Sequence, residues 1–294
     1  MIDVNEYIES LEMLPTSSHK DNHALILDYF ADLVDYDLHK HLVAELMTKY
    51  TEVSKQLEEK NILLNKYNTQ LEELVEEKVK EISTSQIATI HALVKSAEAR
   101  DDDTGAHIER TAMYCRLIAE KLFEAGMHKD IVNKTYIDNI EKAAPLHDIG
   151  KVAISDAILL KPGKLTDDEF VIMKTHVTRG YKTLASVANL YSENEFLNLG
   201  MEISRYHHEK WDGSGYEDRL AGEDIPLSAR IMALSDVYDA LRSKRVYKDA
   251  FSHEKSIEII KRGRGTHFDP ELVDIFLEYH QQFCDIFDKL GSVK

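Results

Sequence analysis

The sequence predicts an all-α protein, on three observations. Its 294 residues include only 5 prolines and 12 glycines, so few positions interrupt a helix. Apolar residues recur three and four positions apart, as at Leu234, Val237 and Leu241, which is the spacing of one helix face. No stretch alternates apolar and polar residues over the length of a strand.

Residues 1–44 are the first of three regions, and we expect a small helical module there. Pro15 ends a first amphipathic segment, because proline is not tolerated in a helix interior. Ile26, Phe30 and Leu33 then mark a second segment at helical spacing. Nothing in this region predicts a more specific fold.

Residues 45–90 form the second region and carry the heptad pattern of a long coiled-coil signalling helix. Glycine and proline are absent, and apolar residues recur every seven positions on two interleaved seams. The seams are Tyr50, Leu57, Leu64 and Leu71, and Leu46, Val53, Tyr67 and Leu74. Such seams are buried only against another helix, so we expect a homodimer through this segment. A long helix packed on its own chain is the alternative.

Residues 91–294 form the third region, which we expect to be a compact helical domain. Helices are expected near residues 107–125, 133–148, 166–190, 195–210, 226–243, 253–262 and 270–289. The loops between them fall where glycine and proline gather, for example at residues 161–164 and 212–215.

Charge and composition exclude several classes of protein. With 36 basic and 53 acidic residues the net charge is −17, so we expect no DNA binding through phosphates. No apolar run has the ~18–20 residues of a membrane-spanning helix, and the acidic N-terminus lacks the layout of a secretory signal. The isolated Cys115 and Cys284 suit free thiols better than a disulfide. We therefore expect a cytoplasmic protein without membrane insertion.

Histidine and aspartate side chains at scattered positions predict a metal site in the third region. The adjacent pairs His147-Asp148 and His207-His208 lie near expected helix ends, where both members of a pair can face one site. Asp236 interrupts a helix that otherwise looks buried and shares a face with Ala233 and Ala240, where an unpaired carboxylate is costly. The remaining candidates are His107, His176 and Asp103, the last of which lies one helical turn before His107.

The joint pattern carries this prediction, because a lone histidine is usually an ordinary surface or core residue. Together the candidates supply mixed imidazole and carboxylate donors without thiolate. This set suits two divalent ions of near-octahedral coordination, with Fe first, Mn as the alternative, and Zn or Ni less well.

The order His107, His147-Asp148, Asp236 resembles the H…HD…D layout of the HD phosphohydrolase superfamily. The surrounding motifs resemble its HD-GYP branch, the cyclic di-GMP phosphodiesterases. They are ARDDDTGAHIER (99–110), APLHDIGKVAISDAILLKPGKLTDDEF (144–170), RYHHEKWDGSGY (205–216), ARIMALSDVYDALRSKRVYK (229–248) and RGRGTHFDPELVDIF (262–276). The chain departs from the signature where the family's Gly-Tyr-Pro reads Gly215-Tyr216-Glu217.

The resemblance implies an HD-type helical bundle and a role for each matching residue. The implied metal ligands are His107, His147, Asp148, His176, His207, His208 and Asp236, with Asp148 bridging two ions. Asp103 stands where some family members use a glutamate for a third metal, and its shorter side chain argues against that metal here. The implied catalytic residues are Lys151 and Asp148, and the implied substrate contacts are Lys151, Arg245, Lys248 and Tyr216.

The implied reaction is metal-dependent hydrolysis of cyclic di-GMP to pGpG, with GMP as the product of continued hydrolysis. Two divalent ions activate a water molecule and stabilise the charge that develops during in-line attack on the phosphodiester. GGDEF-type signalling proteins are expected partners. Glu217 motivates an alternative, a low-activity scaffold that binds nucleotide or a protein partner. A related enzyme acting on another cyclic dinucleotide is the third interpretation.

Overall fold

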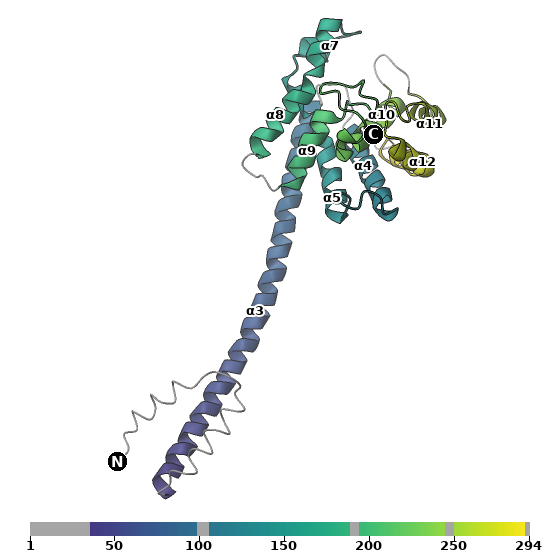
Figure 1. Cartoon of the computed structure of the whole chain (residues 1–294). Helices are drawn as coiled ribbons and strands as arrows, with labels where there is room; N and C mark the ends of the chain where they lie inside the picture. The colour runs from purple at the N-terminus through teal and green to yellow at the C-terminus, as the bar shows by residue number, and fades with distance from the viewer. Residues whose placement is uncertain (1–35, 99–105, 189–193, 245–249, 292–294) are drawn as a thin grey trace. The chain divides into compact units, whose positions relative to one another are not determined.

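The structure, a computed structural model, describes residues 36–98, 106–188, 194–244 and 250–291, without the side chains of 36–39, 86, 91, 97 and 98 (Figure 1). The predictions made for residues 1–35 and for Asp103, Arg245 and Lys248 lie outside these ranges. Contacts divide the chain into two units, Met1–Lys80 and Glu81–Lys294.

Every regular element in the described ranges is helical, which confirms the predicted fold class. The α-helices are α3 (Tyr36–Glu98), α4 (Ala106–Glu124), α5 (Lys134–Ala143), α6 (Asp156–Leu159), α7 (Asp167–Lys174), α8 (His176–Ala188), α9 (Glu195–Tyr206), α10 (Leu227–Arg242), α11 (His253–Arg262) and α12 (Pro270–Gly291). Short 3₁₀ helices are η1 (Ala144–Leu146), η2 (Ile149–Ala153) and η3 (Gly222–Asp224). None of the described helices combines the length and the apolar character needed to cross a membrane.

The described part of the first unit is the N-terminal portion of α3. The expected heptad side chains are exposed along it, with Tyr50 at 44%, Leu64 at 56% and Leu71 at 58% of their full exposure. A single copy of this helix therefore leaves its apolar seam in water. The helix runs past both expected region boundaries, at residues 44 and 90, and these boundaries stay predictions.

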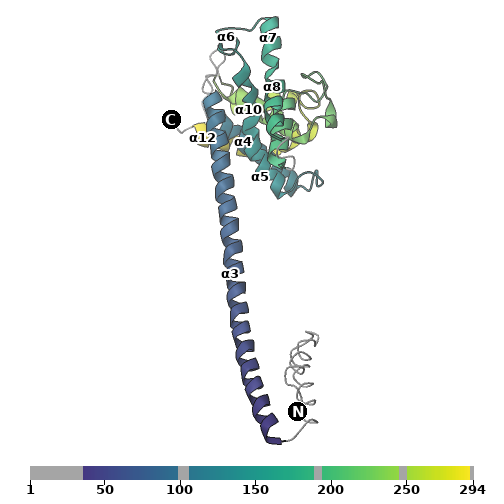
Figure 2. The same ribbon diagram turned by 90° about the vertical axis from the view of Figure 1, so that its left-hand side faces the viewer.

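The second unit is built around one large apolar core. Helices α4, α5, α9, α10, α11 and α12 supply its side chains, and several of these helices lie side by side in Figures 1 and 2. Aromatic rings fill its centre: Tyr114 stacks on Phe283 at 5.1 Å between ring centroids, and Tyr238 packs against Phe276 at 5.3 Å. Burial of such large rings supplies the main stabilisation of a helical domain.

A smaller apolar cluster lies next to the candidate site residues. It joins Val94 near the end of α3 to Ile108, Leu146 and Leu184, all of them buried. Ile108 directly follows His107, and Leu146 directly precedes His147. Packing of this cluster therefore fixes the backbone that carries two of the predicted metal ligands.

The helix expected over residues 166–190 is wrong in one respect, because the chain forms two helices there. Thr166 caps the start of α7: its side chain accepts a hydrogen bond from the backbone amide of Glu169, and the Glu169 side chain accepts one from the backbone amide of Thr166. The helix ends at Lys174, and α8 begins anew at His176 after Thr175. The expected 133–148 helix likewise ends at Ala143 and tightens into 3₁₀ turns around a proline. Both breaks lie beside candidate ligands.

Gly150 allows two of these segments to meet. A Cβ atom at this position would collide with the carbonyl of His176 and lie 2.5 Å from the amide nitrogen of Gly180. Only glycine lets the backbone after Asp148 approach the first turn of α8 this closely. The close approach brings Asp148 and His176 to one site.

Candidate metal centre

His147 and Asp148 lie between the two 3₁₀ turns that follow α5. The Nδ1 atom of His147 lies 2.9 Å from the carbonyl oxygen of Ala144, one turn earlier. A carbonyl only accepts hydrogen bonds, so Nδ1 carries the proton and Nε2 presents its lone pair to the site. The local turn thus sets both the orientation and the tautomer of this side chain.

The same arrangement recurs at two further histidines from other elements. Nδ1 of His176, at the start of α8, donates to the carbonyl of Met173 at 2.8 Å. Nδ1 of His207, at the end of α9, donates to the carbonyl of Ile203 at 2.9 Å. A second nitrogen held by a hydrogen bond is the usual state of a metal-binding histidine.

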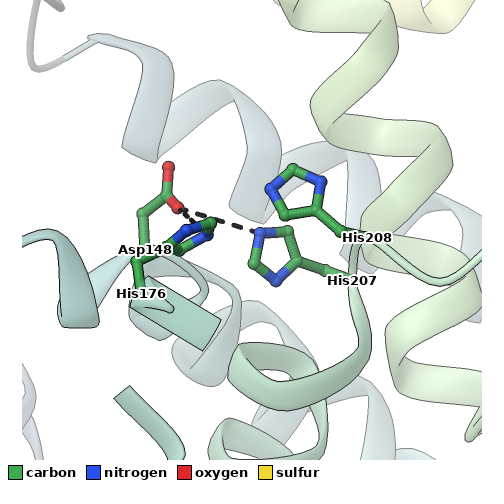
Figure 3. Close-up of side chains that lie close together, drawn as sticks. All are labelled: Asp148, His176, His207 and His208. Carbon is green, nitrogen blue, oxygen red and sulfur yellow. Dashed lines mark ion pairs between the residues drawn. The ribbon is translucent and has the colours of Figure 1, made fainter. Parts of the chain in front are cut away.

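These side chains meet in a first group that can hold a metal ion, made of Asp148, His176, His207 and His208 (Figure 3). One ligand atom from each lies within 4.8 Å of those of the others. Oδ1 of Asp148 lies 3.2 Å from Nε2 of His176 and 3.8 Å from Nε2 of His207. Figure 3 shows the carboxylate and these imidazoles facing a common point.

A second group, made of His107, His147 and Asp236, lies beside the first. Nε2 of His107 lies 3.7 Å from Oδ1 of Asp236. The other oxygen of Asp148, Oδ2, lies 3.3 Å from Nε2 of His147. The two carboxylate oxygens of Asp148 therefore face different groups, which is the geometry that a bridging ligand needs.

The residues present fit a divalent metal. Nε2 of His176 and of His207 is buried and makes no hydrogen bond to any described residue. Buried polar atoms without a partner are uncommon, because each loses its hydration without compensation. A cation accepts these lone pairs directly, and imidazole with carboxylate is a donor set for such ions. The centre thus supports divalent metal binding; the identity and number of ions belong to the proposal below.

A buried hydrogen-bond network contacts His107 through its Nδ1 atom. Its Nδ1 lies 2.8 Å from Oδ2 of Asp239, and Arg110 donates two hydrogen bonds to the same carboxylate, at 2.6 and 2.7 Å. Burial opposes charging of His107, but the hydrogen bond to Asp239 and the nearby carboxylates raise its pKa above the ordinary value. Asp239 therefore orients this imidazole and increases its basicity.

Three further groups, His207, His208 and Asp148, have pKa values that favour metal binding. Burial, and then the neighbouring His208, hold the pKa of His207 well below its usual value. Burial and the charge of His176 lower the pKa of His208 to about 4. Burial would raise the pKa of Asp148, but Lys151 and His147 hold it well below the usual value. Neutral imidazoles and an ionised carboxylate are the forms that bind metal.

Two predicted substrate residues also lie at the centre. Nζ of Lys151 lies 2.7 Å from Oδ2 of Asp148, so its ammonium borders both groups. The ring of Tyr216 stacks on His208 with 4.9 Å between centroids. The structure thus brings together the seven predicted ligands, Lys151 and Tyr216, whereas Asp103, Arg245 and Lys248 lie outside the described residues.

Glu217, where the chain departs from the family signature, has partners of its own. Its carboxylate accepts a hydrogen bond from Thr178 and lies 3.5 Å from Nη1 of Arg205. The buried Glu209 fixes the same loop, since its Oε1 accepts the backbone amides of Asp218 and Arg219 at 2.7 and 2.9 Å. The carboxylate of the glutamate that replaces proline is therefore paired with residues other than the predicted metal ligands.

Asp239 is the functional residue that the sequence analysis missed. The sequence does contain a feature that singles out Asp239: it follows Asp236 by three positions and so is a second acid on a largely apolar helix. Its hydrogen-bond partners could not be predicted, because His107 and Arg110 lie more than a hundred residues away in the chain.

Comparison with known proteins agrees with this geometry. The family model described as "HD domain" matches residues 53–272. A curated relative from Vibrio cholerae, a "Probable cyclic di-GMP phosphodiesterase", is 49% identical over a match that covers 79% of this chain and 53% of the relative's length. Another from the same organism, a "Cyclic di-GMP phosphodiesterase", is 50% identical over 70% of this chain and 42% of the relative's length. A third, a "3'3'-cGAMP-specific phosphodiesterase 2" from the same organism, is 44% identical over 67% of this chain and 35% of its own.

The chain belongs to the HD domain family. Its expected place in the HD-GYP branch is confirmed by the relatives that carry the name cyclic di-GMP phosphodiesterase. The chain spans about half or less of the length of these relatives, so their activities describe longer proteins.

Proposed function

We propose that this chain is a metal-dependent phosphodiesterase that opens cyclic di-GMP to pGpG. The observation that carries the proposal is the convergence of five histidines and two aspartates in two adjoining groups. The relatives' names supply the substrate class. GMP would mark a second round of hydrolysis at the same centre.

Two divalent ions, with Fe first and Mn second, are the proposed cofactors. His176, His207 and His208 would hold one, His107, His147 and Asp236 the other, and Asp148 would bridge them. When bound, such ions activate a water molecule and polarise the phosphodiester. The Asp103 side chain is short for a third ion, so we propose two.

The chain's own residues would orient the substrate and balance its charge. Lys151 borders both ligand groups, so its ammonium can donate a hydrogen bond to a phosphate oxygen or a proton to the leaving oxygen. Arg245 and Lys248, by resemblance, would hold the phosphates. These cations let an anionic dinucleotide approach a chain whose net charge is −17.

A second substrate is 3'3'-cGAMP, which a relative 44% identical to this chain carries in its name. The alternative to an enzyme, which Glu217 motivates, is a low-activity scaffold that binds nucleotide or a protein partner. The contacts of Glu217 with Arg205 and Thr178 give that side chain partners other than the metal ligands, so the ligand set that the enzyme needs is intact beside it.

The exposed seam of α3 supports a homodimer in which two copies of this helix form a coiled coil. Cytoplasmic location, GGDEF-type partners and the absence of DNA binding stay predictions from the sequence.

The test is turnover by protein purified without oxygen, loaded with Fe²⁺ or Mn²⁺ and assayed for metal content. Cyclic di-GMP and 3'3'-cGAMP are supplied separately, and products are separated by chromatography. Asp148→Ala is the matched control, which should lose both bound metal and turnover. Metal-replete protein that binds a cyclic dinucleotide but forms no product would establish the scaffold instead.

A further inference from the structure

Two aromatic rings from separate elements lie next to the metal centre. One face of Tyr216 stacks on His208. Tyr216 also contacts Phe170 of α7, with 6.3 Å between the ring centroids and an interplanar angle of 77°. Phe170 is thus two ring contacts from a predicted metal ligand. The sequence analysis used Tyr216 but assigned Phe170 no role.

A lysine fixes the arrangement of this pair. Nζ of Lys174, one turn after Phe170 on α7, lies 5.3 Å from the ring centroid of Phe170 and 5.6 Å from that of Tyr216. A cation over aromatic faces is attracted by their π electrons and holds their relative orientation. It also places a positive charge beside the rings, where an anionic ligand benefits from it.

Packing of the core does not account for Phe170. The side chain is 47% exposed and belongs to neither apolar cluster of the second unit. Leaving so much aromatic surface in water forgoes the stabilisation that burial of the ring would give. Its neighbour Val171 is also exposed, at 58%, and carries no aromatic ring, so it serves as a comparison.

On the basis of the function proposed above, we propose that Phe170, oriented by Tyr216 and Lys174, forms a stacking surface for one purine base of the cyclic dinucleotide. One sugar separates each base from its phosphate, so with a phosphate at the metal centre a base falls beside that centre. Aromatic faces are the usual platform for bases because every base has a π face. The exposed ring of Phe170 would be covered only when substrate is bound.

The test compares Phe170→Ala with Phe170→Trp and with Val171→Ala, a control at a neighbouring exposed position of the same helix. The probe for binding is a phosphorothioate analogue of cyclic di-GMP, measured by calorimetry on metal-loaded protein. KM and kcat are measured with cyclic di-GMP itself. Metal content is determined for each variant.

Phe170→Ala should raise the Kd for the analogue and the KM about tenfold, with kcat and metal content within about twofold of wild type. Phe170→Trp should bind at least as tightly as wild type, and Val171→Ala should not differ from it. Lys174→Met should raise Kd by a smaller factor, about threefold.

Equal affinity in Phe170→Ala and wild type, with wild type binding the analogue, would overturn the stacking surface alone. Absence of binding to metal-loaded wild type would overturn the proposed function and the stacking surface with it. A lower kcat at unchanged Kd would also overturn the assignment, because it would place Phe170 in the chemical step instead of base binding.

Discussion

Nδ1 of His107 lies 2.8 Å from Oδ2 of Asp239, and this buried hydrogen bond joins the first turn of α4 to the last turn of α10. The same carboxylate receives two hydrogen bonds from Arg110. Asp239 thus compensates a buried cation and orients a predicted metal ligand at once. Its removal should lower the free energy of unfolding and weaken metal binding, and the two effects can be measured separately.

Asp239→Asn should weaken metal binding about 10–100-fold, because the amide cannot hold the imidazole as strongly or raise its basicity. Metal titration of the purified protein measures this. The free energy of unfolding should fall by about 3–5 kcal/mol, because the asparagine keeps only one acceptor oxygen for Arg110 and leaves the buried guanidinium without its counter-charge. Ser243→Ala is the control, because Ser243 also contacts Asp239, at 3.2 Å, but carries no charge. Equal metal affinity in both variants would contradict the positioning role.

Glu217→Ala should leave metal content unchanged and turnover within about twofold of wild type. The Glu217 carboxylate lies 3.5 Å from Arg205 at a partly exposed position, and such pairs contribute about 0–1 kcal/mol. Arg205 keeps Asp218 as a partner at 2.7 Å. Steady-state kinetics on cyclic di-GMP check this expectation. A tenfold change in turnover would show that the glutamate tunes the site.

The double variant Leu57→Asp with Leu64→Asp should convert a dimer into a monomer. Both side chains lie on the exposed heptad seam, at 52% and 56% exposure, and a charge there would have to be buried between two helices. Light scattering after size-exclusion chromatography measures the mass. Lys66→Asp, off the seam, is the control and should remain dimeric. A wild-type protein that is monomeric at micromolar concentration would exclude the coiled-coil dimer.

Stability should decrease as the pH falls from about 6.5 toward 4, in part because of His267. The ring stacks on Phe268 with 4.2 Å between centroids, and burial, then the charge of Lys210, lower the pKa of His267 to about 4. Between these pH values the unfolded chain binds a proton that the folded chain does not, so acid favours unfolding.

His267→Gln should therefore make the fall in urea midpoint between pH 7 and pH 5 smaller than in wild type. His41→Gln, at an exposed position of α3, is the matched control and should leave that fall unchanged. If the two variants and wild type lose equal stability over this interval, His267 does not contribute.

Much of the centre could be predicted because its chemistry resides in residue types at fixed spacings. His147-Asp148 and His207-His208 follow helices whose apolar periodicity is visible in the sequence, so the positions of the pairs near helix ends could be expected. Helix ends were harder, as the break at Thr175 shows, because a cap depends on a few local hydrogen bonds that periodicity does not reveal.

The sequence by itself determined the helical class, the long heptad helix and the set of imidazole and carboxylate donors, because periodicity and residue type are local properties. Only the tertiary structure decided that Asp239 orients His107, that Glu217 pairs with Arg205, and that Phe170 lies beside Tyr216. Each of these contacts joins residues that belong to different helices or loops. Such contacts are set by how helices pack, which no single helix specifies.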